Sequence, residues 1–185
     1  GVPIGLAAGY FGGWVDDLIS RAIDTLLSFP AIVLAIAVTS ALGVGLTNGM
    51  IAVGIVFSPQ LARLARARTL VVRSELYVDA ARCFGASSRH ILWRHVLPNA
   101  IQPVIVQVTL LLAAALLAEA SLSFLGLGIQ PPNPSWGAML ARAYQTMEVA
   151  PEQMYPPGLA ILVTALAFNA LGESLRVALD PTLKK

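Results

Sequence analysis

VLPNAIQPVIVQVTLLLAAALLA, residues 96–118, contains no acidic or basic side chain. A helix needs about 20 apolar residues to cross the hydrocarbon core of a bilayer. Pro98 and Pro103 kink such a helix without excluding it from a membrane, because neighbouring helices satisfy the freed backbone groups. The segment therefore predicts a membrane-spanning helix at residues 96–118.

Three other stretches without charged residues lie at 25–62, 120–141 and 153–172. The turn formers of residues 43–49 interrupt the first, which predicts spans at 25–42 and at 50–60, the latter continuing to residue 62. The last stretch predicts a span at 157–172. Charged residues make up 12% of the chain, against about 25% in soluble proteins, and mean hydropathy is +0.75. We expect an all-α integral membrane protein of one domain, residues 1–185, with about four complete spans.

Residues 1–14 are apolar but too short to cross about 30 Å of hydrocarbon at about 1.5 Å per residue. We expect them to be the remnant of a further span that begins before the sequence, which starts without Met and without the basic region of a signal peptide. Gly5, Gly9 and Gly13 recur every four residues and predict a small-residue stripe on which another helix packs closely. The alternative is a glycine-rich loop.

Lys and Arg are distributed unequally between the predicted loops, and this asymmetry predicts orientation. Seven of the twelve basic residues are arginines at positions 63–94. The other basic residues on that side are Arg21, Arg176, Lys184 and Lys185, and only Arg142 lies on the opposite side. We expect the loop at 62–95 and the C-terminus to be cytoplasmic. The connecting segment at 126–155 is then extracytoplasmic, and Gly and Pro exclude regular helix from its first part, 126–134.

The basic loop is patterned like a structured element rather than a simple linker. Residues 77–84 have helix-forming composition, and Ala80 and Ala81 would leave one face of that helix bare. Gly85 can end the helix in the left-handed conformation. Such a face suits docking on a partner protein. The alternative interpretation is a basic tether that contacts anionic membrane lipid.

The same loop resembles a known motif. Asp79-Ala80-Ala81, then Gly85 after three residues, then His95-Val96-Leu97-Pro98 after nine, is similar to the Glu-Ala-Ala loop of importer permeases of the ATP-binding-cassette superfamily. The chain departs from the usual pattern at Asp79, which replaces Glu, and at His95, which replaces Ile. The resemblance implies that the loop couples the permease to an ATPase through Asp79, Ala80, Ala81, Arg82, Gly85, Leu97 and Pro98.

The resemblance covers almost the whole chain. Residues 9–16, 118–128, 134–140 and 168–172, with Leu179-Asp180-Pro181, are similar to the dipeptide, oligopeptide and nickel permeases, specifically the second of their paired permease subunits. It implies a helical bundle of the type I importer kind in the bacterial inner membrane. The implied partners are a second permease subunit, two cytoplasmic ATPase subunits and an extracytoplasmic solute-binding protein. The transported solute would be a peptide or a related small solute, with dipeptide, oligopeptide, nickel chelate and glutathione left open.

No catalytic, cofactor or metal site is expected in the chain, and no nucleic-acid partner. The only lysines are Lys184 and Lys185, so the Gly-Lys-Ser/Thr phosphate-binding pattern is absent and partner subunits must hydrolyse ATP. His90 and His95 are five residues apart, which does not place them on one face of an α-helix, and no cysteine or carboxylate cluster joins them. Cys83 is the only cysteine, so we expect a free thiol.

The competing function is an ion-gradient-driven secondary transporter, which would need inverted repeats or broken helices at the membrane midplane. The sequence shows neither. A chain of this composition that handles ions would also be expected to carry charged groups within its spans, and these spans carry almost none.

Three polar residues in the apolar segments are candidates for the translocation pathway or a gate: Gln107, Glu119 and Asn169. Glu119 is acidic in an otherwise uncharged region, and an ionisable group there is a functional candidate. Its position close to the outer end of a predicted span also favours structural hydrogen bonding. Gln107 and Asn169, and also Gln102, can line a pathway or hold spans together. The sequence leaves these alternatives open.

Overall fold

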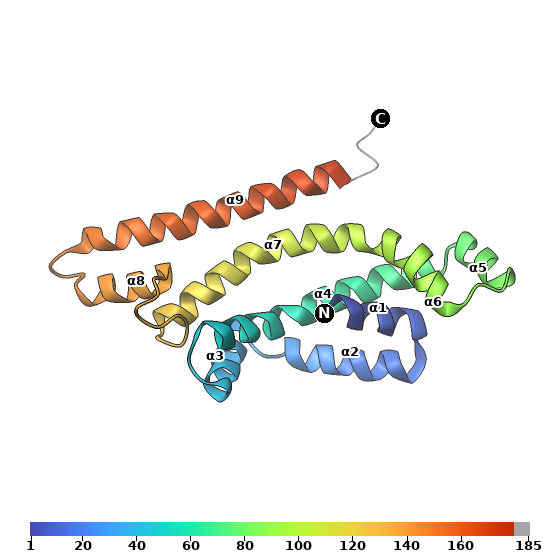
Figure 1. The fold of residues 1–185 in the computed structure, drawn as a ribbon, viewed down its shortest axis with the longest axis horizontal. Helices are drawn as coiled ribbons and strands as arrows, with labels where there is room; N and C mark the ends of the chain where they lie inside the picture. Colours follow the sequence, from blue (N-terminus) through green and yellow to red (C-terminus); the bar gives the residue numbers. More distant parts are fainter. Residues whose placement is uncertain (180–185) are drawn as a thin grey trace. The chain divides into compact units, whose positions relative to one another are not determined.

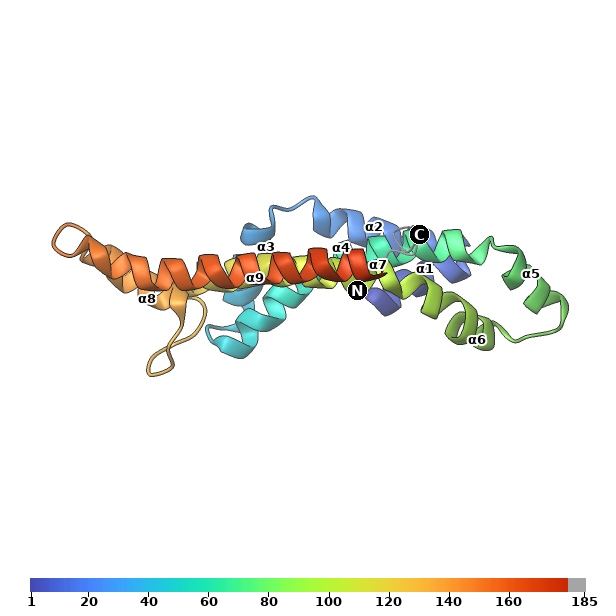
Figure 2. The ribbon, with the colours of Figure 1, turned by 90° about the horizontal axis from the view of Figure 1, so that it is seen from above.

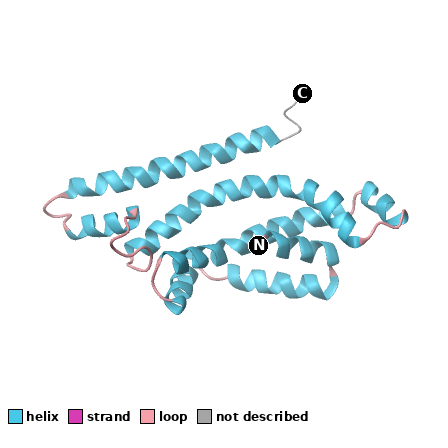
Figure 3. Ribbon diagram, in the orientation of Figure 1, coloured by secondary structure: helices cyan, strands magenta, loops and turns pink. Residues whose placement is uncertain are grey.

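The structure is a computed structural model that describes residues 1–179, and all regular elements in this part of the chain are helices (Figure 3). The motif residues Asp180 and Pro181 and the basic Lys184 and Lys185 lie outside the described residues. The α-helices are labelled in Figure 1, and the elements in chain order are α1 (Val2–Phe11), α2 (Gly13–Leu27), α3 (Ala31–Leu42), α4 (Leu46–Arg73), α5 (Leu76–Cys83), α6 (Ser88–Ile91), the π-helix η1 (Leu92–Val96), α7 (Leu97–Phe124), α8 (Trp136–Gln145), the 3₁₀ helix η2 (Pro151–Met154) and α9 (Tyr155–Leu179).

Three helical segments among the described residues are long and apolar enough to cross a membrane. They are Leu46–Arg73, Ser88–Phe124 and Pro151–Leu179, and each contains a predicted span. A fourth is counted only if the bent pair Gly13–Leu27 and Ala31–Leu42 forms one span. The prediction of an all-α chain with several membrane spans is confirmed.

The span predicted at 25–42 is not one continuous helix. α2 ends at Leu27 and α3 begins at Ala31. Pro30 has no backbone N–H and disfavours helical geometry at Phe29, so the helix stops before it. α3 has 12 residues, which at about 1.5 Å per residue is too short for the roughly 30 Å of hydrocarbon.

α4 extends well beyond the predicted span at 50–62. It runs from Leu46 to Arg73 and contains Pro59 in its interior. Residues 62–73, expected to open the cytoplasmic loop, therefore continue the helix. The other end of the predicted loop is also helical, because α6, η1 and α7 follow one another without a break. What remains of the loop is α5 and the short turns on either side of it.

The described residues form two compact units, which we treat separately. One unit, called unit 1 here, consists of residues 1–28, 58–108 and the described residues from 175 on. Unit 2 consists of residues 29–57 and 109–174. The helices α4, α7 and α9 contribute residues to both.

Unit 1 has an apolar core to which α5 is attached. Val78 of α5, Ile91 of α6 and Val96 of η1 are at most 1% exposed. Burying such side chains contributes about 1.5–3 kcal/mol each. α5 and α6 lie beside each other in both views of the ribbon (Figure 1, Figure 2). The complete core cluster is Leu6, Tyr10, Val72, Val78, Ile91, Val96 and Ala100.

The predicted glycine stripe is only partly correct. A Cβ built on Gly5 would overlap the carbonyl group of Ala62, and one on Gly9 would overlap Thr69 of α4. The backbones of α1 and α4 therefore approach closely through these glycines, as small-residue stripes allow. Gly13 does not take part: it has a φ of +56° and no atom within 4 Å of a built Cβ. Its freedom allows the turn from α1 into α2.

Two ion pairs connect α2 to α4 within unit 1. Arg66 donates to both carboxylate oxygens of Asp16, and Arg63 donates to Asp24 at 2.6 Å. The Arg66–Asp16 pair is the more buried, with side-chain exposures of 32% and 15%, whereas both partners of the other pair are more than half exposed. A bidentate pair of this kind fixes the geometry between two helices. The extension of α4 past residue 62 thus brings its arginines to acidic partners on α2.

Unit 2 has a smaller core, formed by Ala35, Val53, Val56 and Leu122. The predicted irregular stretch at 126–134 contains no helix, and Gly126 follows the end of α7 with a φ of +79°. The rest of the predicted connecting segment is more ordered than expected, because it contains α8 and η2. Ser135 starts α8 by accepting a hydrogen bond from the N–H of Ala138 at 3.1 Å.

Candidate functional site

α5 is the short helix predicted at residues 77–84, and the structure places it at Leu76–Cys83. One face is anchored, because Val78 is fully buried in the core of unit 1 and Ala81 packs against the same core. The opposite face is exposed and carries Asp79 and Ala80. Ala81 was predicted to belong to the docking face, but the structure places it on the anchored side.

The C-terminal end of α5 has the geometry predicted for Gly85. Its φ is +79°, its N–H bonds to the carbonyl of Arg82 at 2.9 Å, and the N–H of Ala86 bonds to the carbonyl of Ala81 at 3.0 Å. This pair of bonds is the Schellman motif. A Cβ built on Gly85 would meet no atom within 4 Å, so a substitution there is opposed by backbone conformation and not by a clash.

Large apolar side chains stand exposed around α5. Leu76 at its start is 85% exposed, Phe84 just after its end is 92% exposed, and Trp93 of η1 is 63% exposed. Asp79 forms a 3.0 Å ion pair with Arg82 on the surface, with both side chains exposed. Exposed apolar groups rimmed by polar residues mark interaction surfaces. The exposed face of α5 with Leu76 and Phe84, called the α5 surface below, is therefore a candidate contact site.

The remaining predicted coupling residues lie where α7 begins. Leu97 is half-buried and packs against the same core as Ala81, whereas Pro98 is exposed. The structure therefore brings Ala81 and Leu97 to one core, and it presents Asp79, Ala80, Arg82 and Gly85 to the outside.

η1 corrects the prediction about the two histidines. The N–H of Leu97 bonds to the carbonyl of Leu92, five residues back, and in a π-helix residues five apart lie on one face. The rings of His90 and His95 are accordingly 5.7 Å apart, and Tyr77 of α5 lies 6.2 Å from His95. Burial, with a contribution from Glu75, raises the pKa of Tyr77 above its usual value. Pro98 lacks the N–H that a regular α-helix would direct to Arg94, which favours the irregular turn.

Glu119 lies in a small hydrogen-bonded network of unit 2. Ser123 donates its hydroxyl to Glu119 at 2.6 Å and accepts the N–H of Ile129 at 3.2 Å. A Cβ built on Gly128 would overlap Ser123, so the backbone after α7 passes directly over this serine. Of the two roles considered for Glu119, the arrangement fits structural hydrogen bonding, in which Glu119 stabilises the turn after α7 through Ser123. Gln107 belongs to unit 1 and Asn169 to unit 2, and a pathway role for these residues stays a prediction.

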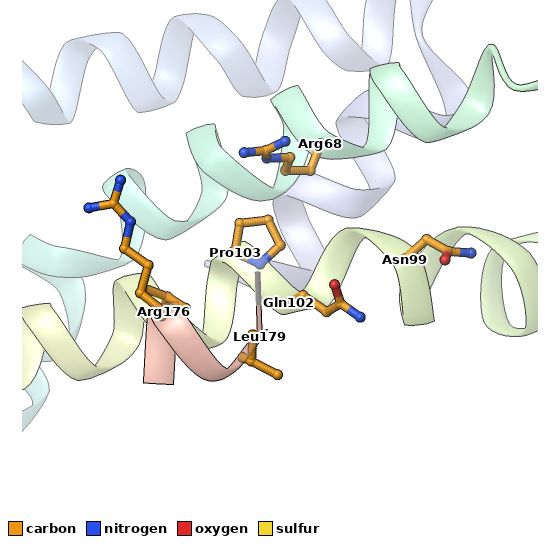
Figure 4. A pocket seen from close by; sticks show the side chains of 7 residues that line it. Arg68, Asn99, Gln102, Pro103, Arg176 and Leu179 are labelled. Carbon is orange, nitrogen blue, oxygen red and sulfur yellow. The ribbon is translucent and has the colours of Figure 1, made fainter. Parts of the chain in front are cut away.

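A polar groove in unit 1 was not predicted from the sequence (Figure 4). Its volume is about 430 Å³. Arginines from α4 and α9 and amide side chains from α7 line it. From the sequence, those arginines predicted only the orientation of the chain in the membrane. The spacing of the α7 residues, three and four apart on one helical face, was the available signal. The lining residues are Arg68, Asn99, Gln102, Pro103, Val106, Arg176 and Leu179.

Comparisons with known proteins agree with this picture. The family model described as binding-protein-dependent transport system inner membrane component matches residues 1–185. The chain is similar to the glutathione transport system permease protein GsiD of Pectobacterium atrosepticum, with 48% identity over 184 residues, 100% of this chain and 61% of the relative. The GsiD proteins of Escherichia coli O157:H7 and Shigella dysenteriae serotype 1 are 50% and 49% identical over 175 residues, 95% of this chain and 58% of each relative. The chain thus spans about six tenths of the length of these relatives.

Proposed function

We propose a function for the chain from one premise: it belongs to the family of binding-protein-dependent transport system inner membrane components. It is an integral membrane transport component and not an enzyme. We propose that it is a permease subunit of an ATP-driven bacterial importer and forms part of the translocation pathway for peptides or a related small solute. The glutathione permeases at about half identity support a short acidic peptide such as glutathione as the solute.

The proposed partners are a second permease subunit, two cytoplasmic ATPase subunits and an extracytoplasmic binding protein. α9 leaves an apolar surface on which a lateral partner can pack, because only 11% of its most apolar window is buried by this chain. Leu162, Val163 and Leu166 on this helix are each more than half exposed. Lipid or a second permease subunit would cover such a surface.

The observation that carries the proposed coupling is the α5 surface. Its exposed Leu76 and Phe84 stand in an otherwise polar, arginine-rich segment, where lipid tails would not cover them. A protein cleft that takes up both ends of α5 would bury this apolar area. The ATPase subunit is the partner that an importer permease must contact to receive energy, so we assign the α5 surface to it.

The packing of unit 1 offers a route for the movement. Val78 on α5 shares one core with Ile91 and Val96, which lie directly before α7. Because a close-packed core transmits displacement, a shift of α5 would move the start of α7 as a rigid body. We propose that ATP-driven closure of the ATPase pair rocks the spans in this way between inward-open and outward-open states.

The orientation proposed from the basic residues places α5 and the C-terminus in the cytoplasm. A thiol reagent that does not cross membranes tests it. It should label a cysteine introduced at Ser135 in intact cells and reach native Cys83, an exposed free thiol, only after permeabilisation. Labelling of Cys83 from outside would reverse the proposed topology.

Uptake into vesicles that contain the complete transporter tests the function itself. We expect uptake to need ATP, to stop with vanadate and to continue when an uncoupler collapses the proton gradient. The ion-gradient alternative deserves this test because the helix pair α2–α3 is broken in the structure, and broken helices occur in secondary transporters. Uptake that stops with the uncoupler and ignores vanadate would replace the importer proposal with that alternative.

A further inference from the structure

The polar groove of unit 1 is large enough for part of a small solute. Its volume of about 430 Å³ lies in the range of about 300–1,000 Å³ found for ligand pockets. Three helices contribute to it: Arg68 comes from α4, Asn99 and Gln102 from α7, and Arg176 from α9 (Figure 4). Pro103, Val106 and Leu179 provide its apolar lining.

The charge of the groove selects an anion. Among the described residues that line the groove, Arg68 and Arg176 are the two ionisable ones, and none is acidic. A guanidinium group presents a planar fork of N–H donors that matches the two oxygens of a carboxylate. Both arginines are exposed rather than buried, so each contributes only modestly to affinity. Weak binding suits a transported solute, because the solute must leave the site again.

The groove also offers hydrogen-bond acceptors. Pro103 has no N–H, so the carbonyl of Asn99, four residues before it, lacks its regular helical donor. The side-chain amide of Asn99 donates to the carbonyl of His95 at 2.7 Å, which directs its own oxygen away from that bond. Gln102 adds a second exposed amide. A peptide's ammonium group requires such oxygen acceptors, because it carries donors only.

We propose that this groove is a transient binding site for the transported solute, a short peptide that carries free carboxylates. Arg68 and Arg176 bind its carboxylates, and the oxygens of Asn99 and Gln102 accept hydrogen bonds from its amino group. This proposal rests on the proposed import function, and it adds that the pathway selects solutes with negatively charged groups. It belongs to the same unit as α5, so the solute occupies it at the end of the pathway where the ATPase acts.

Direct binding provides the primary test. The probe is radiolabelled glutathione with free carboxyl groups, compared with its diamide, in which both carboxyl groups are amidated (the amide below), and the sample is the complete nucleotide-free complex without binding protein. We expect Arg68→Gln and Arg176→Gln each to weaken binding of the free acid severalfold, and the double variant to weaken it about tenfold or more. Binding of the amide should change no more than twofold. Arg68→Lys keeps the positive charge but not the fork of donors, so it should retain only part of the affinity, and Arg142→Gln on α8 is the matched control.

Equal losses for the free acid and the amide, or no loss in the double variant, would overturn the proposal. A phospholipid headgroup is the other source of an oxyanion. If the defect appears only in vesicles with anionic lipid and vanishes in phosphatidylcholine alone, the groove serves lipid and the proposal also fails.

Uptake by the same complexes separates this proposal from the import function. We expect the double variant to reduce glutathione uptake about tenfold while the loaded binding protein still stimulates ATP hydrolysis. If the unmodified complex shows no ATP-driven uptake, the import function fails. The binding measurement then still decides whether the groove binds carboxylates.

Discussion

α1 and α9 are both apolar helices, yet the chain covers them very differently. α1 lies against α4 so closely that its glycines leave no room for a Cβ, and five of its residues, including Leu6 and Tyr10, are buried. α9 is far longer, but only 11% of its most apolar window is buried. One face of α1 is therefore covered within this chain, although Ile4 and Phe11 stay exposed, whereas most of α9 requires lipid or another subunit. α5 combines both situations, with Val78 buried on one side and Phe84 exposed on the other.

The largest effect is expected where the covered face of α1 is disturbed. Gly5→Leu would force a side chain into the carbonyl group of Ala62 on α4, and overpacking of this kind typically costs about 1–3 kcal/mol or more. We expect loss of most folded permease, measured as the amount extracted in mild detergent. Gly54→Leu is the matched control, because a Cβ at Gly54 meets no atom within 4 Å. Equal amounts of the two variants would contradict the close contact of α1 with α4.

The next effect concerns coupling rather than folding. Gly85→Val places a β-branched residue at a φ of +79°, which costs on the order of 1–2 kcal/mol. We expect near-normal permease levels but at least a tenfold loss of uptake and of the ATPase stimulation by loaded binding protein. Gly85→Asn, which tolerates the left-handed conformation better, should restore a large part of both activities. A Gly85→Val complex with normal uptake would remove the end of α5 from the mechanism.

Two neighbouring alanines separate the anchored side of α5 from its exposed side. Ala81→Glu introduces a charge beside the core of unit 1, so we expect a lower permease level as well as lost uptake. Ala80→Glu changes only the exposed side, so the level should stay normal and the ATPase subunits should co-purify less well. Quantitative co-purification checks both. Identical behaviour of the two variants would contradict the division of α5 into two faces.

The smallest effect is expected on α9. Leu166 is 57% exposed, and Leu166→Gln should leave insertion unchanged while it weakens association with the second permease subunit a fewfold. Leu166→Met is the conservative control. The measurement is the ratio of the two permease subunits after purification. A strong loss of insertion would contradict this account, because it would show that Leu166 is needed for the folding of this chain itself.

The sequence predicted the spans at 96–118 and 157–172 because long uncharged segments have few alternatives to a membrane helix. It also predicted α5 and its Gly85 ending, since alanines and a glycine at this spacing encode local geometry. It missed the break before α3, although Pro30 signals it, because the hydropathy of residues 25–42 does not show this break. The ion pairs between the arginines of α4 and the acidic residues of α2 are tertiary contacts, and the common face of His90 and His95 depends on a π-helix. Neither feature can be predicted from the regular period of an α-helix.

The polar groove also could not be predicted from the sequence, because residues far apart in the chain form it. Arg68 and Arg176 are more than a hundred positions apart in the sequence, and only packing places them around one cavity. Their count predicted orientation, whereas their shared position required the structure. The glycine stripe failed at Gly13 for a related reason, since a positive φ there turns the chain out of α1.

Crosslinking from native Cys83 tests the central claim, that the α5 surface docks on the ATPase. Cys83 is the last residue of α5 and an exposed thiol, so a short thiol-attached photocrosslinker probes the surface without any substitution in this chain. In the assembled complex we predict a product with an ATPase subunit whose yield changes when a non-hydrolysable ATP analogue is added. A complex that gives no ATPase product, or gives lipid or binding-protein products instead, would contradict the claim.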